Sequence, residues 1–165
     1  DKLHPDDRHI DLGDANVVVL GVGRLGRAAY DRLTQTYGLR VLGVELDEDA
    51  VVALQRQGLN VVHGDATDDD FWDRITRTHR VKIAVLAMPE HGSNRTALEK
   101  LEASEFEGAV AVVAQFPYEI AEMKHQGAHA VFHLYEGAGV ALADRAASAA
   151  GIHRPDVLPE ASPGD

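Results

Sequence analysis

The amino-acid sequence predicts a single α/β domain built on a doubly wound parallel sheet. Three observations predict this fold class. Short apolar runs alternate with segments of helical spacing, a glycine-rich turn joins the first run to the first helix, and the fourth run is almost entirely apolar. Strands that alternate with helices through short connections form parallel sheets with both faces covered.

The first apolar run leads directly into a glycine motif. Residues 16–20 read Asn-Val-Val-Val-Leu, and residues 21–26 read Gly-Val-Gly-Arg-Leu-Gly. Between a strand and a helix, G-x-G-x-x-G indicates a turn that binds phosphate at the helix N-terminus. The first glycine permits the sharp turn, the second lets a pyrophosphate approach the backbone, and the third lets the helix pack on the strand. The residues predicted to hold phosphate are Gly21, Val22, Gly23, Arg24, Leu25 and Gly26. For Arg24, a solvated loop arginine is the alternative interpretation.

The alternation continues to the last helix. We expect strands over 16–20, 40–46, 60–63, 82–87, 109–114 and 130–134. We expect helices over 24–37, 48–57, 93–104, 117–126 and 139–150, and a further one capped by Thr67 or Asp68. A phosphate-binding turn after the first strand selects the Rossmann strand order 3-2-1-4-5-6. The expected organisation is an arm at 1–15, one Rossmann-type domain at 16–150 and a flexible tail at 151–165.

Acidic residues at the ends of the second and third strands complete the predicted site. Glu45 is placed to accept hydrogen bonds from both ribose hydroxyls, and it would repel a 2′-phosphate, so an NAD-type ligand is favoured over NADP. Its alternative role is a solvated carboxylate at a strand end. Asp47 points to the opposite face and is expected to cap the next helix. Asp65 and Ala66 follow the third strand at the same edge and are expected to line an adenine pocket, where Asp65 accepts from the exocyclic amine. The alternative for Asp65 is an ordinary loop acid that supports the turn at Thr67.

Composition excludes several classes of function. The formal charge is −11 and the sequence has no basic stripe, so nucleic acid is not expected as a partner. The chain has no cysteine, which excludes disulfides, thiolate zinc sites and thiol catalysis. No apolar run approaches the roughly 20 residues of a membrane-spanning helix. The first residue is Asp1 rather than Met, and we expect a fragment of a longer protein.

Histidines and a stripe of small residues are candidates for a metal site and an oligomer interface. His125, His129 and His133 are each four residues apart, but Gly127 interrupts a helix there, so we predict no metal site. His91 follows the fourth strand and is expected to be a solvated loop residue. The stripe of small apolar residues in the last helix is either core or an oligomer seam. Its members are Val140, Ala143, Ala147 and Ala150.

The sequence favours a binding module over an enzyme. The Tyr-x-x-x-Lys pair of short-chain dehydrogenases is absent, and no second domain supplies a substrate site. A methyltransferase would add a final antiparallel hairpin, which the sequence does not predict. An NAD-dependent oxidoreductase fragment is the remaining alternative.

Four segments of the chain together carry a family resemblance. They are the 21–26 motif, Val44-Glu45-Leu46-Asp47, Gly64-Asp65-Ala66-Thr67-Asp68 and Tyr135-Glu136-Gly137-Ala138. They resemble the TrkA-N (RCK/KTN) regulatory domains. The resemblance covers 16–150 and is strongest to Kef-type glutathione-regulated potassium-efflux antiporters. It implies a domain that binds NAD(H), AMP or another adenine nucleotide and forms a homodimer through its last helices. It further implies a ligand-gated switch on a membrane potassium transporter, at the cytoplasmic face of the inner membrane.

The resemblance also adds site residues and one departure. It places Leu46 beside Glu45 at the ligand, makes Met88 an apolar wall where the family often has acids, and matches Asn94 to an asparagine near the nucleotide. Kef domains carry arginines that help hold glutathione after the fifth strand, whereas this chain has Ala-Gln-Phe-Pro-Tyr over 114–118. Glutathione sensing is therefore not implied.

Overall fold

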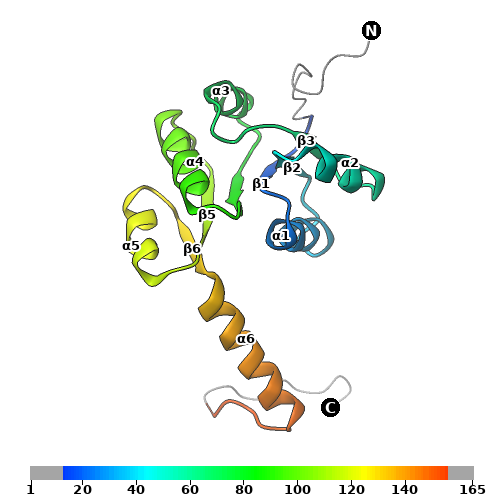
Figure 1. Cartoon of the computed structure of the whole chain (residues 1–165), viewed down its shortest axis with the longest axis vertical. Coiled ribbons are helices and arrows are strands. Elements are labelled where there is room, and N and C mark those ends of the chain that lie inside the picture. Colours follow the sequence, from blue (N-terminus) through cyan, green and yellow to red (C-terminus); the bar gives the residue numbers. More distant parts are fainter. Residues whose placement is uncertain (1–12, 156–165) are drawn as a thin grey trace.

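The computed structural model describes residues 13–155, apart from the side chain of Thr76, and contains one six-stranded parallel sheet (Figure 1). The strand order is β3-β2-β1-β4-β5-β6, which confirms the predicted fold class and order. The strands are β1 (Val17–Leu20), β2 (Val41–Glu45), β3 (Val61–His63), β4 (Ile83–Leu86), β5 (Ala109–Ala114) and β6 (Ala130–His133). The helices are α1 (Arg24–Gln35), α2 (Glu48–Arg56), α3 (Asp69–Thr78), α4 (His91–Ala103), α5 (Pro117–His125) and α6 (Leu134–Ala149).

The apolar strands are buried because helices cover both faces of the sheet. All four residues of β1 are fully buried. Val18 packs in one cluster with Trp72 of α3 and Leu98 of α4, whereas Val19 packs on the other face with Tyr30 of α1. Alternate side chains of a strand point to opposite faces, so this central strand needs apolar residues at every position.

Helix α6 is the exception to this packing. None of its residues is buried, and Figure 1 shows it leaving the edge of the sheet and extending away from the other helices. Val140 and Leu142 are 56% and 72% exposed. Of the two interpretations of the small-residue stripe in this helix, a core role within the single chain is therefore wrong.

Two helices begin earlier than the sequence predicted, while every strand lies within one residue of its predicted bounds. Helix α6 starts at Leu134 rather than at 139. The helix runs through Gly137, where a Cβ would come 2.1 Å from Phe132 Cζ. Helix α4 starts at His91 rather than at 93, so His91 is helical and half-buried instead of being a solvated loop residue.

The predicted arm at 1–15 and tail at 151–165 lie mostly outside the described residues, and the domain bounds stay a prediction. Within 13–155, no helix is both long and apolar enough to cross a membrane.

Candidate functional site

A cavity opens at the carboxyl ends of the strands, where the strand order reverses. β1 pairs with β2 on one side and with β4 on the other, and connections leave in opposite directions from this point. Such a switch point is where open α/β sheets bind ligands. The cavity has a volume of about 330 Å³, at the lower end of the usual range for ligand pockets. It is lined by Gly21, 44–47, 64–67, 88–90 and Ser93.

The three motif glycines differ in the space that a side chain would have. Gly21 has a φ of +87°, and a Cβ there would lie 2.8 Å from Met88 Cα. A Cβ on Gly26 would lie 1.7 Å from the carbonyl oxygen of Gly21, so this position admits only glycine. At Gly23 a Cβ would meet no described atom within 4 Å. Packing therefore requires the outer two glycines, and the middle one leaves space above the turn.

The open turn leads into a helix N-terminus that has no side-chain cap. Gly23 is the N-cap of α1, and the first turn of that helix contains no acidic residue. The first backbone N–H groups of a helix lack intrahelical partners and carry partial positive charge. Arg24, the first helical residue, is exposed and adds a full positive charge. Of the six motif residues, Gly21 lines the cavity, whereas the other five do not among the described residues: Val22, Gly23, Arg24, Leu25 and Gly26.

Glu45 ties the glycine turn to the end of β2. Its Oε1 accepts a hydrogen bond from the Val22 N–H at 3.0 Å, and its Oε2 accepts one from the Asp47 N–H at 2.9 Å. Each carboxylate oxygen keeps a second lone pair for a ligand hydroxyl. Asp47 caps α2, accepting from the N–H groups of Asp49 and Ala50, so its predicted capping role is confirmed.

The segment after β3 forms the opposite wall. Asp65 accepts hydrogen bonds from the N–H and the hydroxyl of Thr67, and it stays exposed at the cavity. Asp68, rather than Thr67, caps α3. Ala66 is buried, and its carbonyl accepts a 2.6 Å hydrogen bond from the indole of Trp72.

Apolar side chains close the rest of the cavity. Leu46 is 64% exposed at its mouth, and His63 Nε2 lies 2.9 Å from the Leu46 carbonyl oxygen. Met88 is half-buried and lines the cavity next to Gly21. Asn94 does not line it among the described residues. The Asn94 amide instead accepts from the Met88 N–H and donates to the Met88 carbonyl, which fixes the turn after β4.

The cavity itself is acidic. Glu45, Asp47, Asp65 and Glu90 line it, and no lysine or arginine does so among the described residues. Helices α1 and α4 both begin at this edge without a side-chain cap, and α1 also has a cation, Arg24, in its first turn. The N-terminus of α1 is therefore the better place for an anionic group.

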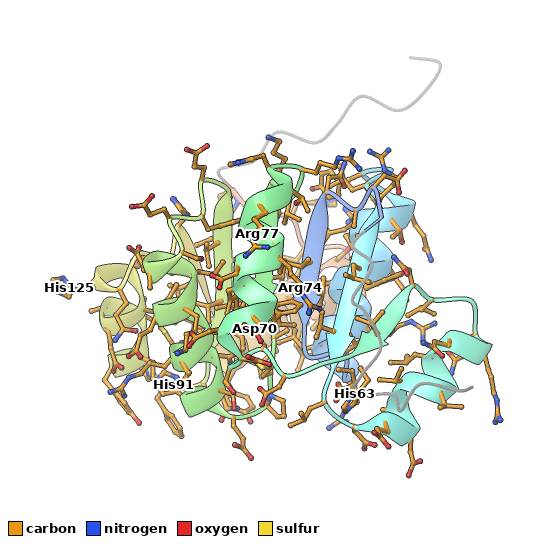
Figure 2. All side chains as sticks on the ribbon, turned by 90° about the horizontal axis from the view of Figure 1, so that it is seen from above. His63, Asp70, Arg74, Arg77, His91 and His125 are labelled. Atoms are coloured by element: carbon orange, nitrogen blue, oxygen red, sulfur yellow. The ribbon has the colours of Figure 1, made fainter. Side chains whose placement is uncertain are left out.

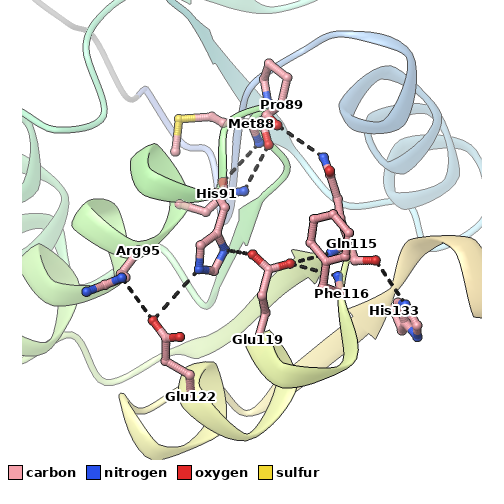
Figure 3. Close-up of polar contacts among 10 residues, drawn as sticks. Met88, Pro89, His91, Arg95, Gln115, Phe116, Glu119, Glu122 and His133 are labelled. Atoms are coloured by element: carbon pink, nitrogen blue, oxygen red, sulfur yellow. Dashed lines mark hydrogen bonds and ion pairs between the residues drawn. The ribbon is translucent and has the colours of Figure 1, made fainter.

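Sequence reasoning missed a polar cluster beside this cavity (Figure 3). Glu119 of α5 is 1% exposed, and its Oε2 lies 2.5 Å from His91 Nδ1. Its Oε1 accepts from the N–H groups of Gln115 and Phe116. Figure 2 shows His91 at the same edge of the molecule as His63. One signal was available, since a Glu at the third position of a helix that starts with Pro117 often accepts from the N-cap N–H.

The three spaced histidines have separate local contacts. His129 Nδ1 accepts from the Val110 N–H, His133 lies against Glu136 and Gln115, and His125 is at the end of α5. Within the described chain, no group of three or more His, Asp or Glu side chains is arranged to hold a metal ion.

Comparison with known proteins identifies the family. The model of the TrkA-N domain matches residues 17–134, which include every strand, the glycine turn and the cavity. The chain belongs to the TrkA-N family. Comparison with curated protein sequences gives no match.

Several solved structures share the fold of this TrkA-N domain. One is the NAD(P)-binding domain of an exopolyphosphatase-related protein from Archaeoglobus fulgidus, with 22% identity and a TM-score of 0.73 over 81% of this chain and 98% of that one. Another is the TrkA-N domain of the inner membrane protein YbaL from Escherichia coli, with 17% identity and a TM-score of 0.69 over 82% and 98%. A third is the GsuK channel bound to NAD, with 17% identity and a TM-score of 0.64 over 78% of this chain and 23% of that one. GsuK has also been solved bound to ADP.

Proposed function

We propose that this TrkA-N domain is a regulatory module that binds an adenine nucleotide, NAD(H) or AMP and its relatives, and switches a potassium efflux or transport system. The observation that carries the proposal is the open position above Gly23, at an uncapped helix N-terminus in the turn whose first residue, Gly21, lines the cavity. Protein packing does not require a glycine there, whereas a phosphate that approaches the backbone does.

The proposed ligand follows the cavity from the glycine turn outward. Phosphate oxygens accept hydrogen bonds from the first N–H groups of α1 and pair with Arg24. The ribose hydroxyls donate to Glu45, and the adenine lies against Leu46, Ala66 and Met88. Asp65 accepts from the exocyclic amine of the base. In this proposal the nucleotide-binding domain spans 16–150, between the arm at 1–15 and the tail at 151–165.

Relatives support the regulatory part of the proposal. GsuK, a channel, has been solved with NAD and with ADP, and YbaL is an inner membrane protein. The potassium substrate, the Kef-type relationship and the place at the cytoplasmic face of the inner membrane rest on the sequence resemblance. No catalytic group is assigned. The nucleotide is proposed to bind one arrangement of the domain better than another and so to shift the state of the transporter.

The proposed assembly is a homodimer through α6. This helix has 16 residues, none of them buried, and it exposes Val140 and Leu142. Next to it, Phe132 of β6 is 53% exposed. Exposed apolar surface of this extent marks a protein interface. Sedimentation should show a dimer that Leu142→Asp dissociates and that Gln35→Asp, on the exposed end of α1, leaves intact. A monomeric wild-type chain would contradict the proposed assembly.

Calorimetry with AMP, ADP, NAD and NADH tests the ligand. At least one should bind with a dissociation constant below about 1 mM. Gly23→Ala should weaken that binding about tenfold with little loss of stability, since a Cβ there meets no described atom within 4 Å and takes the space left for phosphate. No binding by the wild type would overturn the proposal. Steady NADH oxidation with a carbonyl substrate would instead favour the oxidoreductase.

A further inference from the structure

The cavity occupies only one half of the crevice that a dinucleotide needs. Rossmann sheets bind dinucleotides across two mononucleotide-binding halves, on either side of the switch point. Here the lining residues follow β1, β2, β3 and β4, and none of the described lining residues follows β5 or β6. The second half of the crevice lies between the ends of β4, β5 and β6.

In that second half, Gln115 bridges the loops that follow β4 and β5. The Gln115 side-chain amide donates a hydrogen bond to the Pro89 carbonyl at 3.3 Å (Figure 3). The backbone carbonyl oxygen of Gln115 lies 3.1 Å from His133 Nε2. His133 Nδ1 lies 2.9 Å from the Glu136 carboxylate in the first turn of α6. One glutamine thus connects the wall of the cavity to the end of β6.

Buried groups hold the backbone of this glutamine in place, and from there its side chain reaches the Pro89 carbonyl. The Gln115 N–H donates to Glu119 Oε1 at 2.9 Å, and the Phe116 N–H donates to the same oxygen at 2.8 Å. The other oxygen of Glu119 contacts His91, the first residue of α4. Because Glu119 is 1% exposed, moving this loop away would leave a buried carboxylate without its partners.

We infer that the site selects adenosine mono- and diphosphates over dinucleotides, and that Gln115 is the residue that sets this selectivity. The inference rests on the proposed function, since it concerns the ligand of the same cavity. ADP needs only the adenosine half and the glycine turn. The second nucleoside of NAD would have to pass the Gln115–Pro89 bridge and break it. The loss of one neutral hydrogen bond corresponds to about three- to tenfold in affinity.

Titration of the full chain with ADP, ADP-ribose and NAD tests this selectivity. The wild type should bind ADP at least threefold more tightly than NAD, with ADP-ribose between them. Gln115→Ala should tighten NAD binding about three- to tenfold and change ADP binding by less than twofold. Gln35→Ala, which removes an exposed glutamine from α1, should change neither ligand.

Two results would overturn the inference while the proposed function stands. One is a wild type that binds NAD as tightly as ADP. The other is an unchanged ratio of ADP to NAD affinity in Gln115→Ala with a wild-type melting temperature. A chain that binds none of the three ligands would instead refute the proposed function itself, so the two failures are distinct.

Discussion

At the ends of β1, β2 and β3 the chain leaves a cavity, which the loop after β4 closes on one side, whereas at the ends of β5 and β6 polar side chains join the loops to one another and to α4. Both halves are built from parallel strands that feed helices through short turns. The first half has glycines at 21 and 23, and the second has Gln115 and a buried Glu119. The backbone topology offers a crevice in each half, and the side chains after each strand decide which one stays open.

The largest expected effect comes from the glycine that holds the open half together. Gly26→Ala places a Cβ 1.7 Å from the Gly21 carbonyl oxygen, so strand and helix must separate. We expect the free energy of unfolding to fall by about 3 kcal/mol or more, measured by chemical denaturation. Gly23→Ala is the matched control, because its Cβ meets no described atom within 4 Å, and it should cost a few tenths of a kcal/mol. Equal losses in both variants would contradict the division of roles among the glycines.

The next effect concerns the closed half. Glu119→Ala removes the acceptor of two backbone N–H groups and the partner of His91. Leaving such groups buried and unpaired should lower the free energy of unfolding by about 2–3 kcal/mol. ADP affinity should stay within twofold, because the cavity lies in the other half.

Glu99→Ala is the control for this variant. It removes a carboxylate of α4 that is 59% exposed and lies 4.0 Å from Arg95, and it should cost about 1 kcal/mol or less. A Glu119→Ala protein as stable as Glu99→Ala would show that the buried cluster does not hold the closed half.

A smaller effect is expected at the ribose position of the open half. Glu45→Ala should weaken ADP binding about tenfold. It removes the proposed acceptor of the ribose hydroxyls and the acceptor of the hydrogen bond from the Val22 N–H. The wild type should bind ADP better than 2′-deoxy-ADP, and the variant should bind both alike. Glu48→Ala removes a neighbouring exposed carboxylate of α2 and should preserve the preference. A preference that survives in Glu45→Ala would exclude this residue from ribose binding.

The open half could be predicted from sequence because its determinants are local. The turn from 21 to 26 and the acid Glu45 lie within single strand–turn–helix units, where spacing fixes geometry. The structure adds that Glu45 also binds the backbone of the turn, and that Asn94 supports Met88 rather than lining the cavity. These contacts depend on how neighbouring strands are placed.

The closed half could not be predicted in the same way. His91 and Glu119 are separated by a helix and a strand, and their contact exists only once α4 and α5 pack side by side on the sheet. The predicted start of α6 at 139 is also too late, since the helix begins at Leu134, directly after β6. Gly137 therefore lies inside the helix beside the Phe132 ring, a contact that the local sequence does not reveal.

The smallest expected effect concerns the contact between α3, which follows the open half, and α4, which belongs to the closed half. Lys100 Nζ lies 2.7 Å from Asp69 Oδ1, and the hydrogen bond and charge of that carboxylate raise the pKa of Lys100 above its ordinary value. The charged lysine is thus favoured in the folded state. The contribution is complete below the ordinary pKa and is lost as pH rises through the raised one.

Lys100→Met should therefore change the melting temperature very little, because exposed ion pairs contribute little to stability. The small difference from the wild type should stay constant across neutral pH and disappear only at strongly alkaline pH. Asp69→Asn should behave in the same way, and the double variant should add nothing further, because both changes remove one interaction. A difference that varied between pH 6 and pH 8 would mean that a group other than Lys100 controls how the two halves are joined.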